Sequence, residues 1–174
     1  MKPIPAQLFY FKDDGIIPNS PLPLLVYRGA FTERAEAGAR WLETTFAAHR
    51  WLGSWRNGVY DYHHYHSTSH EVLGVYAGTA LLKLGGEGGQ ELRVAGGDVI
   101  VIPAGVGHKR LEADDDFAVV GAYPEGRDYD TLRGRPGDRP RADHNLAQVP
   151  LPHQDPVLGE TGGLCEHWAR VRAL

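Results

Sequence analysis

Hydrophobic residues between positions 58 and 124 occur in short runs that are rich in β-branched and aromatic side chains. Glycine-rich or acidic segments separate these runs, which read "EVLGVYAGTALLKL", "QELRVA", "GDVIVIP" and "FAVVGAYP". Short runs at this spacing predict antiparallel strands joined by tight turns, with "GGEGG" at the tip of a hairpin. We therefore expect an all-β sandwich or barrel, and the lack of strand–helix alternation argues against a nucleotide-binding α/β fold.

One helix is predicted, over residues 32–50. Thr32 is the expected N-cap, and Glu33 and Glu36 in the first turn suit the helix dipole. Four apolar side chains recur at helical spacing and form one face: Ala35, Ala39, Leu42 and Phe46. Three tryptophans in and after this segment are expected to pack in the core: Trp41, Trp51 and Trp55.

The length of 174 residues suits a single domain, which we divide into three parts. Residues 1–57 form an N-terminal arm and the helix, with residues 3–31 extended. Residues 58–124 form the core barrel. Residues 125–174 are rich in proline yet carry many apolar side chains, which predicts an ordered segment that wraps the barrel.

The composition argues against some classes of binding partner and indicates a location. The net charge is −4, and no block of Lys or Arg stands out, so neither nucleic acid nor an anionic membrane surface is expected as a partner. The single cysteine, Cys165, cannot form an internal disulfide. No run approaches the roughly 20 apolar residues of a membrane span, and the first fifteen residues lack the apolar core of a signal peptide. A cytoplasmic location is expected.

Four of the nine histidines lie within eight positions, at 63, 64, 66 and 70. If residues 60–66 form a strand, Tyr60, Tyr62, His64 and His66 share one face, because side chains alternate. Glu71 follows after a short turn. Neutral imidazoles together with one carboxylate suit a first-row transition metal.

Two motifs in this region resemble those of the cupin superfamily. The first, G-x5-H-x-H-x4-E-x6-G, is matched at every gap by Gly58, His64, His66, Glu71 and Gly78. The second, G-x5-P-x-G-x2-H-x3-N, is matched by Gly97, Pro103, Gly105 and His108, with Glu112 in place of the asparagine. The segments "HYHSTSHEVLGVYAG", "YPEGRDYD" and "PLPHQDPVLG" further resemble the small, single-domain, YjlB-like bacterial cupins.

This resemblance implies a double-stranded β-helix, the RmlC-like jelly-roll barrel, here with one N-terminal helix and extended N- and C-terminal arms. It also implies one divalent transition metal, iron, manganese, nickel, copper or zinc. The implied ligands are His64, His66, Glu71 and His108. The alternative is a polar barrel mouth that holds no metal.

Other residues near the motifs have two or more interpretations. Tyr60 and Tyr62 could line a substrate pocket or fill the end of the barrel. Arg110 shares the strand face of His108 and could bind a substrate carboxylate or form a surface salt bridge. His70 could be an alternative ligand, a proton relay or, as we favour, a surface turn residue, whereas His63 is expected to face away from the site.

A metal with three histidine ligands and one glutamate keeps open coordination positions, which favours catalysis over a structural site. We therefore expect a metal-dependent enzyme, an oxygenase, isomerase or lyase, that acts on a small polar metabolite. The alternative is a non-catalytic cupin that binds or senses a small molecule. Extended arms and sheet edges in such barrels make a homodimer plausible.

Overall fold

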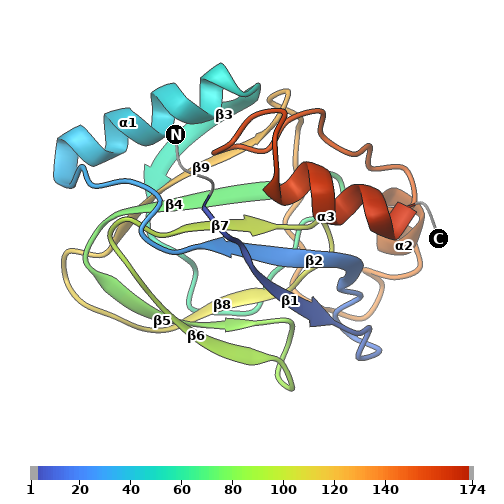
Figure 1. Ribbon diagram of the computed structural model, residues 1–174. Coiled ribbons are helices and arrows are strands. Elements are labelled where there is room, and N and C mark those ends of the chain that lie inside the picture. Colours follow the sequence, from blue (N-terminus) through green and yellow to red (C-terminus); the bar gives the residue numbers. More distant parts are fainter. Residues whose placement is uncertain (1–3, 173–174) are drawn as a thin grey trace.

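The computed structural model describes residues 4–172 and consists mainly of two antiparallel β-sheets (Figure 1). The larger sheet has six strands, in the order β1 (Gln7–Phe11), β2 (Ser20–Tyr27), β7 (Val99–Ile102), β4 (Glu71–Ala77), β9 (Ala118–Pro124) and β3 (Trp51–Asn57). The smaller sheet has three, in the order β6 (Gln90–Ala95), β5 (Thr79–Leu84) and β8 (His108–Ala113). Every strand pairing is antiparallel.

Each apolar run named above contains at least one strand, and "QELRVA" coincides with β6. The predicted hairpin is confirmed, because β5 and β6 pair directly across "GGEGG". The extended N-terminal segment forms β1 and β2, and β2 pairs with β7 inside the larger sheet. Neither β3 nor β8 was among the predicted runs.

The expectation of a strand over residues 60–66 is wrong. This segment forms only two isolated bridges, from His64 to His108 and from Tyr65 to Leu132. Neighbouring residues thus pair with different parts of the chain, so no continuous ladder can form.

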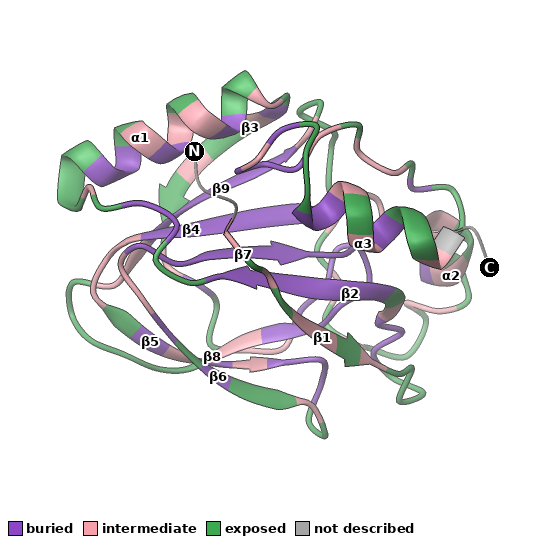
Figure 2. Ribbon diagram, in the orientation of Figure 1, coloured by how far each residue is buried: buried purple, intermediate pink, exposed green. Residues whose placement is uncertain are grey.

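Two apolar layers hold the sheets in place, because β2, β7 and β4 are buried on both faces (Figure 2). Alternate side chains on one face, such as Leu73 and Ile100, pack against Leu82 and Leu84 of the smaller sheet. The opposite face, which includes Val72 and Val101, packs against helices. This double packing fixes the position of β4, whose first residue is Glu71.

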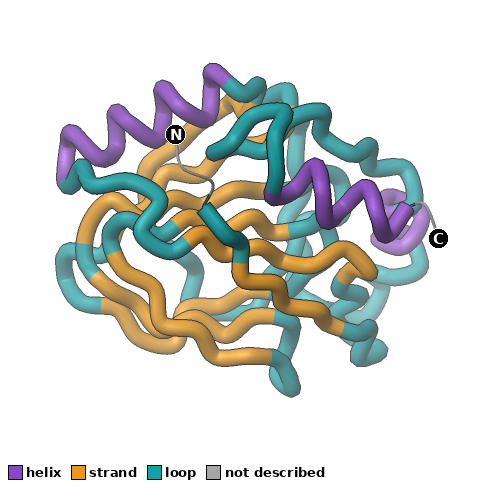
Figure 3. The backbone as a smooth tube through the Cα atoms, in the orientation of Figure 1, coloured by secondary structure: helices purple, strands orange, loops and turns teal. Residues whose placement is uncertain are grey.

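The helices lie outside the strand layers (Figure 3). α1 (Ala35–Ala48) covers the larger sheet, where Leu42 lies so close to Gly74 that a Cβ there would come within 2.3 Å of its Cδ2. Thr32 is not its N-cap. Arg34 holds that position, and its guanidinium binds the carbonyl oxygens of Phe31 and Glu33, so the chain stays irregular up to residue 34.

The prediction of a single helix is also wrong, because the C-terminal segment contains α2 (Arg141–Leu146) and α3 (Gly163–Arg172). Asp155, fully buried, holds this segment against the larger sheet. Its carboxylate accepts hydrogen bonds from the Tyr27 hydroxyl and from the backbone N–H groups of Val157, Leu158 and Leu164. Within residues 4–172, the helices all fall short of the length and apolar character that a membrane crossing requires.

Candidate metal centre

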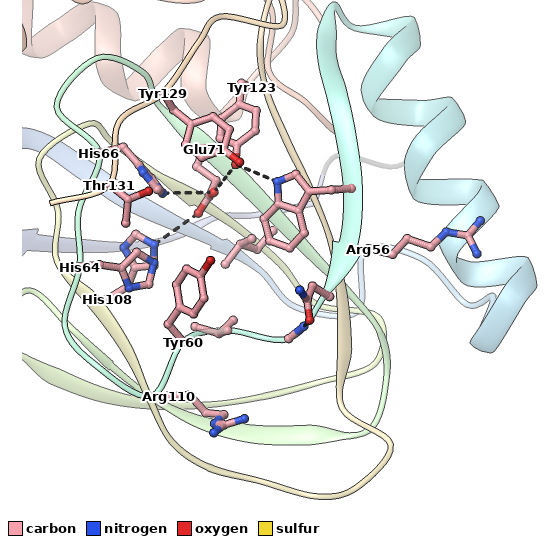
Figure 4. Close-up of a pocket in the computed structure, with 15 residues that line it drawn as sticks. Arg56, Tyr60, His64, His66, Glu71, His108, Arg110, Tyr123, Tyr129 and Thr131 are labelled. Carbon is pink, nitrogen blue, oxygen red and sulfur yellow. Dashed lines mark hydrogen bonds and ion pairs between the residues drawn. The ribbon is translucent and has the colours of Figure 1, made fainter. Parts of the chain in front are cut away.

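Three histidine side chains converge at one end of the sheets (Figure 4). His64 and His66 come from the irregular segment after β3, and His108 is the first residue of β8. One ring nitrogen of each lies within 4.8 Å of the other two. Each of these histidines is buried, so water does not compete freely for their nitrogen atoms.

The other ring nitrogen of each histidine binds a backbone carbonyl oxygen. Nδ1 of His64 lies 3.1 Å from the oxygen of Tyr62, and Nδ1 of His108 lies 3.0 Å from that of Val106. Nδ1 of His66 lies 2.6 Å from the carbonyl oxygen of Asp130. A carbonyl oxygen only accepts, so each Nδ1 carries the hydrogen and each Nε2 can offer a lone pair, as in metal-binding histidines.

Glu71, the first residue of β4, completes the group. Its Oε2 lies 3.3 Å from Nε2 of His66, and its Oε1 lies 3.3 Å from Nε2 of His108. Among the described residues, these two buried Nε2 atoms have no hydrogen-bond partner. Orphaned nitrogen atoms beside a buried carboxylate are costly unless a cation or proton joins them, so the donor set fits a metal ion.

A hydrogen-bond chain orients the carboxylate of Glu71. The indole N–H of Trp55 donates to the hydroxyl oxygen of Tyr123 at 2.7 Å, and that hydroxyl donates to Oε2 of Glu71 at 3.0 Å. The direction is fixed because an indole nitrogen only donates. Trp55 reaches this position by lying directly on Gly121, where a Cβ would come within 2.3 Å of the ring.

Charge within the cluster follows from burial and proximity. Burial by itself would raise the pKa of Glu71, but in the metal-free chain protonated His66 and the hydrogen bonds from His66 and His108 hold it well below its usual range. Burial and the neighbouring His108 lower the pKa of His64 to about 3. Burial and the charge of Glu71 raise the pKa of Tyr123. At neutral pH the site therefore holds an ionised carboxylate, a neutral His64 and a protonated tyrosine.

A second contact holds the histidine segment to the C-terminal part of the chain. The Asp130 carboxylate accepts the backbone N–H of Ser67 at 2.6 Å and the Ser67 hydroxyl at 2.5 Å. Its carbonyl oxygen binds His66, as described above. The loop around Asp130 thus fixes the orientation of His66 from outside the two motifs.

The histidines and Glu71 face a cavity of about 320 Å³. Tyr60 and Tyr129 line it and stay 54% and 46% exposed, so the cavity is open to small molecules. Its other walls include Trp55, Val59, Leu73, Arg110, Tyr123 and Thr131. A metal bound by the four side chains would have a ligand-sized space beside it.

The predicted site residues divide into two groups. The structure brings together His64, His66, Glu71 and His108, and it places Tyr60 and Arg110 on the cavity wall. Tyr62 does not line the cavity; it stacks on Tyr60 with ring centroids 4.8 Å apart.

His70 does not line the cavity either, and the interpretation as a surface turn residue is wrong. The residue is only 3% exposed. Its Nδ1 accepts the backbone N–H of Ala104 at 2.8 Å, and its ring packs against Trp168 of α3. His63 binds Glu87 at 2.9 Å.

Sequence reasoning missed the residues that support the site. Tyr123 and Tyr129 both lie in "YPEGRDYD", the segment noted above for its resemblance to YjlB-like cupins, but they lie outside the two metal motifs and no role was assigned to them. Trp55 was expected only to pack. A polar-tipped aromatic residue on a strand near a ligand set was the available signal, but it does not distinguish a site residue from a core residue.

No family model matches the chain. The uncharacterized protein YjlB of Bacillus subtilis (strain 168) is 43% identical over 166 residues, which are 95% of this chain and 98% of that protein. Three solved structures are more distant. Acireductone dioxygenase from Bacillus anthracis, with cadmium in its active centre, is 18% identical with a TM-score of 0.35, over 50% of this chain and 58% of its own.

A variant of Bacillus subtilis oxalate decarboxylase is 17% identical with a TM-score of 0.39, over 67% of this chain and 29% of its own. A DUF861 family protein from Thermotoga maritima is 21% identical with a TM-score of 0.31, over 46% of this chain and 83% of its own. The sequence relative YjlB, by contrast, matches nearly the full length of both chains.

Proposed function

The chain belongs to the YjlB family of cupin-like proteins, and on this premise we propose that His64, His66, Glu71 and His108 bind one divalent transition metal. The observation that carries the proposal is the convergence of three imidazoles, each oriented through Nδ1, within 4.8 Å. The buried carboxylate between two of them supplies negative charge. Iron, manganese, nickel, copper and zinc all suit such nitrogen and oxygen donors.

We further propose that the protein is an enzyme that acts on a small polar metabolite, of the oxygenase, isomerase or lyase type. The cavity beside the four side chains supports this, because it leaves room for a substrate next to the metal. When bound, a transition metal supplies Lewis-acid or redox chemistry. Tyr60 and Arg110 would position the substrate, and Tyr123 holds its proton on Oε2 of Glu71.

The fold proposed here is the double-stranded β-helix, or jelly roll, with the two sheets as its halves. Antiparallel pairing throughout and the apolar layer shared by both sheets support this arrangement. A cytoplasmic location and a homodimer remain predictions. β1 is an edge strand with Tyr10 64% exposed, which offers a surface for a second copy. A monomer mass by light scattering at micromolar concentration would contradict the dimer.

Metal content tests the proposed function. Protein purified without an affinity tag is expected to contain close to one equivalent of metal per chain by plasma mass spectrometry. The double variant H64A/H66A should lose it, whereas the exposed histidine variant His144→Ala should not. Circular dichroism verifies that each variant is folded. A wild-type protein that takes up no metal even after reconstitution overturns the proposal.

The metal found then selects the assay for turnover. Iron directs the search to oxygen consumption, and zinc or manganese to isomerase and lyase reactions. Ligand-dependent stabilisation of a metal-loaded protein that turns over none of its ligands would favour the non-catalytic binding function instead.

A further inference from the structure

We propose that the cavity takes a flat carboxylate with a single ring, whose carboxylate binds Arg110 and whose ring packs against Tyr60 and Tyr129. The inference deepens the proposed function, because the opposite end of the ligand would face the metal. It is carried by the charge, aromatic surface and dimensions of the cavity itself.

An uncompensated positive charge faces the cavity. In the part of the chain that the structure describes, the Arg110 guanidinium has no hydrogen-bond or ion-pair partner, and it lies on the cavity wall (Figure 4). Arg56 lines the same cavity, but it is bound to Glu36 and Glu43 at 2.7 Å each. The planar, always charged guanidinium of Arg110 is suited to bidentate binding of a carboxylate.

The negative charge available to balance Arg110 must come from the ligand. Among the described residues that line the cavity, Glu71 is the one acid, and its oxygens face His66 and His108. A divalent metal outweighs this single carboxylate charge, which leaves the cavity positive with or without Arg110. An anionic ligand is therefore favoured over a neutral one of the same shape.

Two exposed aromatic rings border the cavity, and each is the outer layer of a stacked pair. Tyr60 stacks on Tyr62, whose ring in turn lies 3.6 Å from the Arg133 guanidinium carbon. Tyr129 stacks on Tyr123 with ring centroids 4.1 Å apart. Rings held in this way lose little entropy when a ligand packs against them, and they favour a flat ligand.

The spacing along β8 gives a scale for the length of the ligand. His108 and Arg110 are two residues apart in a stretch of regular pairing with β5, and both line the cavity. The Cα atoms of two residues at positions i and i+2 of a strand lie about 7 Å apart. That distance separates a carboxylate from a donor atom on the far side of one six-membered ring. A volume of about 320 Å³ also lies at the small end of ligand cavities.

Three probes of matched size test the inference by isothermal titration calorimetry. They are 4-hydroxybenzoate, the neutral 4-hydroxybenzamide and the non-planar trans-4-hydroxycyclohexanecarboxylate. We expect 4-hydroxybenzoate to bind about 10-fold to 100-fold more tightly than the amide and about 2-fold to 10-fold more tightly than the cyclohexane acid. An amide or a cyclohexane acid that binds as tightly overturns the inference, and so does the failure of all three to bind.

Single substitutions test whether Arg110 causes the preference for a carboxylate and Tyr60 the preference for a flat ring. In the metal-free protein, where the metal charge is absent, Arg110→Gln should remove the preference for the carboxylate. Tyr60→Ala should remove the preference for the flat ring. Arg93→Gln and Tyr10→Ala change exposed residues of the same types outside the cavity and should retain both preferences. A metal-free Arg110→Gln protein that still prefers the carboxylate overturns the inference.

The titrations are made on the protein as purified and after removal of metal by a chelator, since neither Arg110 nor Tyr60 is a proposed metal ligand. A protein that takes up no metal yet keeps both preferences overturns the metal-binding function and supports the cavity chemistry. A protein with an intact metal site and no preference overturns the cavity chemistry alone.

Discussion

Tyr123→Phe tests whether the hydrogen-bond chain from Trp55 to Glu71 positions a metal ligand. The variant removes one oxygen and preserves the ring, which stays stacked on Tyr129. Oε2 of Glu71 then loses its donor at 3.0 Å. The orphaned indole N–H of Trp55 destabilises the metal-free and metal-bound forms alike, so its effect cancels in the metal affinity.

The magnitude follows from the bond that is lost. A hydrogen bond to a charged group contributes about 1.5–3 kcal/mol, which corresponds to roughly 10-fold to 100-fold in affinity. The bond also exists without metal, so this is the upper limit, and only the part that holds the carboxylate in place for the metal changes the affinity. Tyr123 lines the cavity, so water can replace part of the lost bond, and the lower end of this range applies. We expect the dissociation constant for metal to increase about 10-fold.

Competition with a chromophoric chelator measures this constant for wild type, Tyr123→Phe and Tyr76→Phe. Tyr76 packs against the core outside the cavity and serves as the matched control. Urea unfolding of the metal-free proteins separates a loss of stability from a loss of affinity. A change smaller than twofold in Tyr123→Phe, or an equal change in Tyr76→Phe, would refute the positioning role.

Two further predictions concern stability. Asp155→Ala leaves the buried Tyr27 hydroxyl and backbone N–H groups without an acceptor, so the free energy of unfolding by urea should fall by about 2–6 kcal/mol. The exposed control Glu160→Ala should change this free energy by less than about 0.5 kcal/mol. A loss below about 1 kcal/mol in Asp155→Ala would contradict the anchoring role. Hydrogen bonds from Arg139 lower the pKa of Asp13 to about 2, so this pair stabilises the fold above pH 3.8 and less as the pH falls towards 2. Arg139→Gln should therefore reduce the drop in unfolding free energy between pH 4 and pH 2, and an unchanged drop would contradict the pairing.

The spacing of the two motifs anticipated which four side chains would meet. Glu71 and His108 each begin a strand, and the segments before them bring both strand starts to one end of the sheets. His64 and His66 reach the same place without a strand, because their positions depend on bridges to His108 and on Asp130. The motif thus predicted the meeting of these residues, but the strand argument for it was wrong.

The hydrophobic pattern of the sequence does not predict contacts between segments that are distant along the chain. Trp55 and Tyr123 are 68 residues apart and meet because β3 pairs with β9, a choice of neighbours that hydrophobic alternation does not specify. His70 is buried by Trp168 of a helix that begins at Gly163 and was not predicted. The short α2 and the Gly-flanked α3 lie in a proline-rich segment, where local propensity favours irregular structure.

The ligands come from both sheets, and this has a consequence for the order of events in folding. Glu71 belongs to the larger sheet and His108 to the smaller, so neither sheet contains the centre before the two have docked. Capture of an ion is then a late step, and a bound ion resists separation of the sheets by about 4 kcal/mol at a thousandfold excess over its dissociation constant. We expect amide hydrogens near residues 64–71 and 108 to exchange faster in the metal-free chain than in the metal-bound chain.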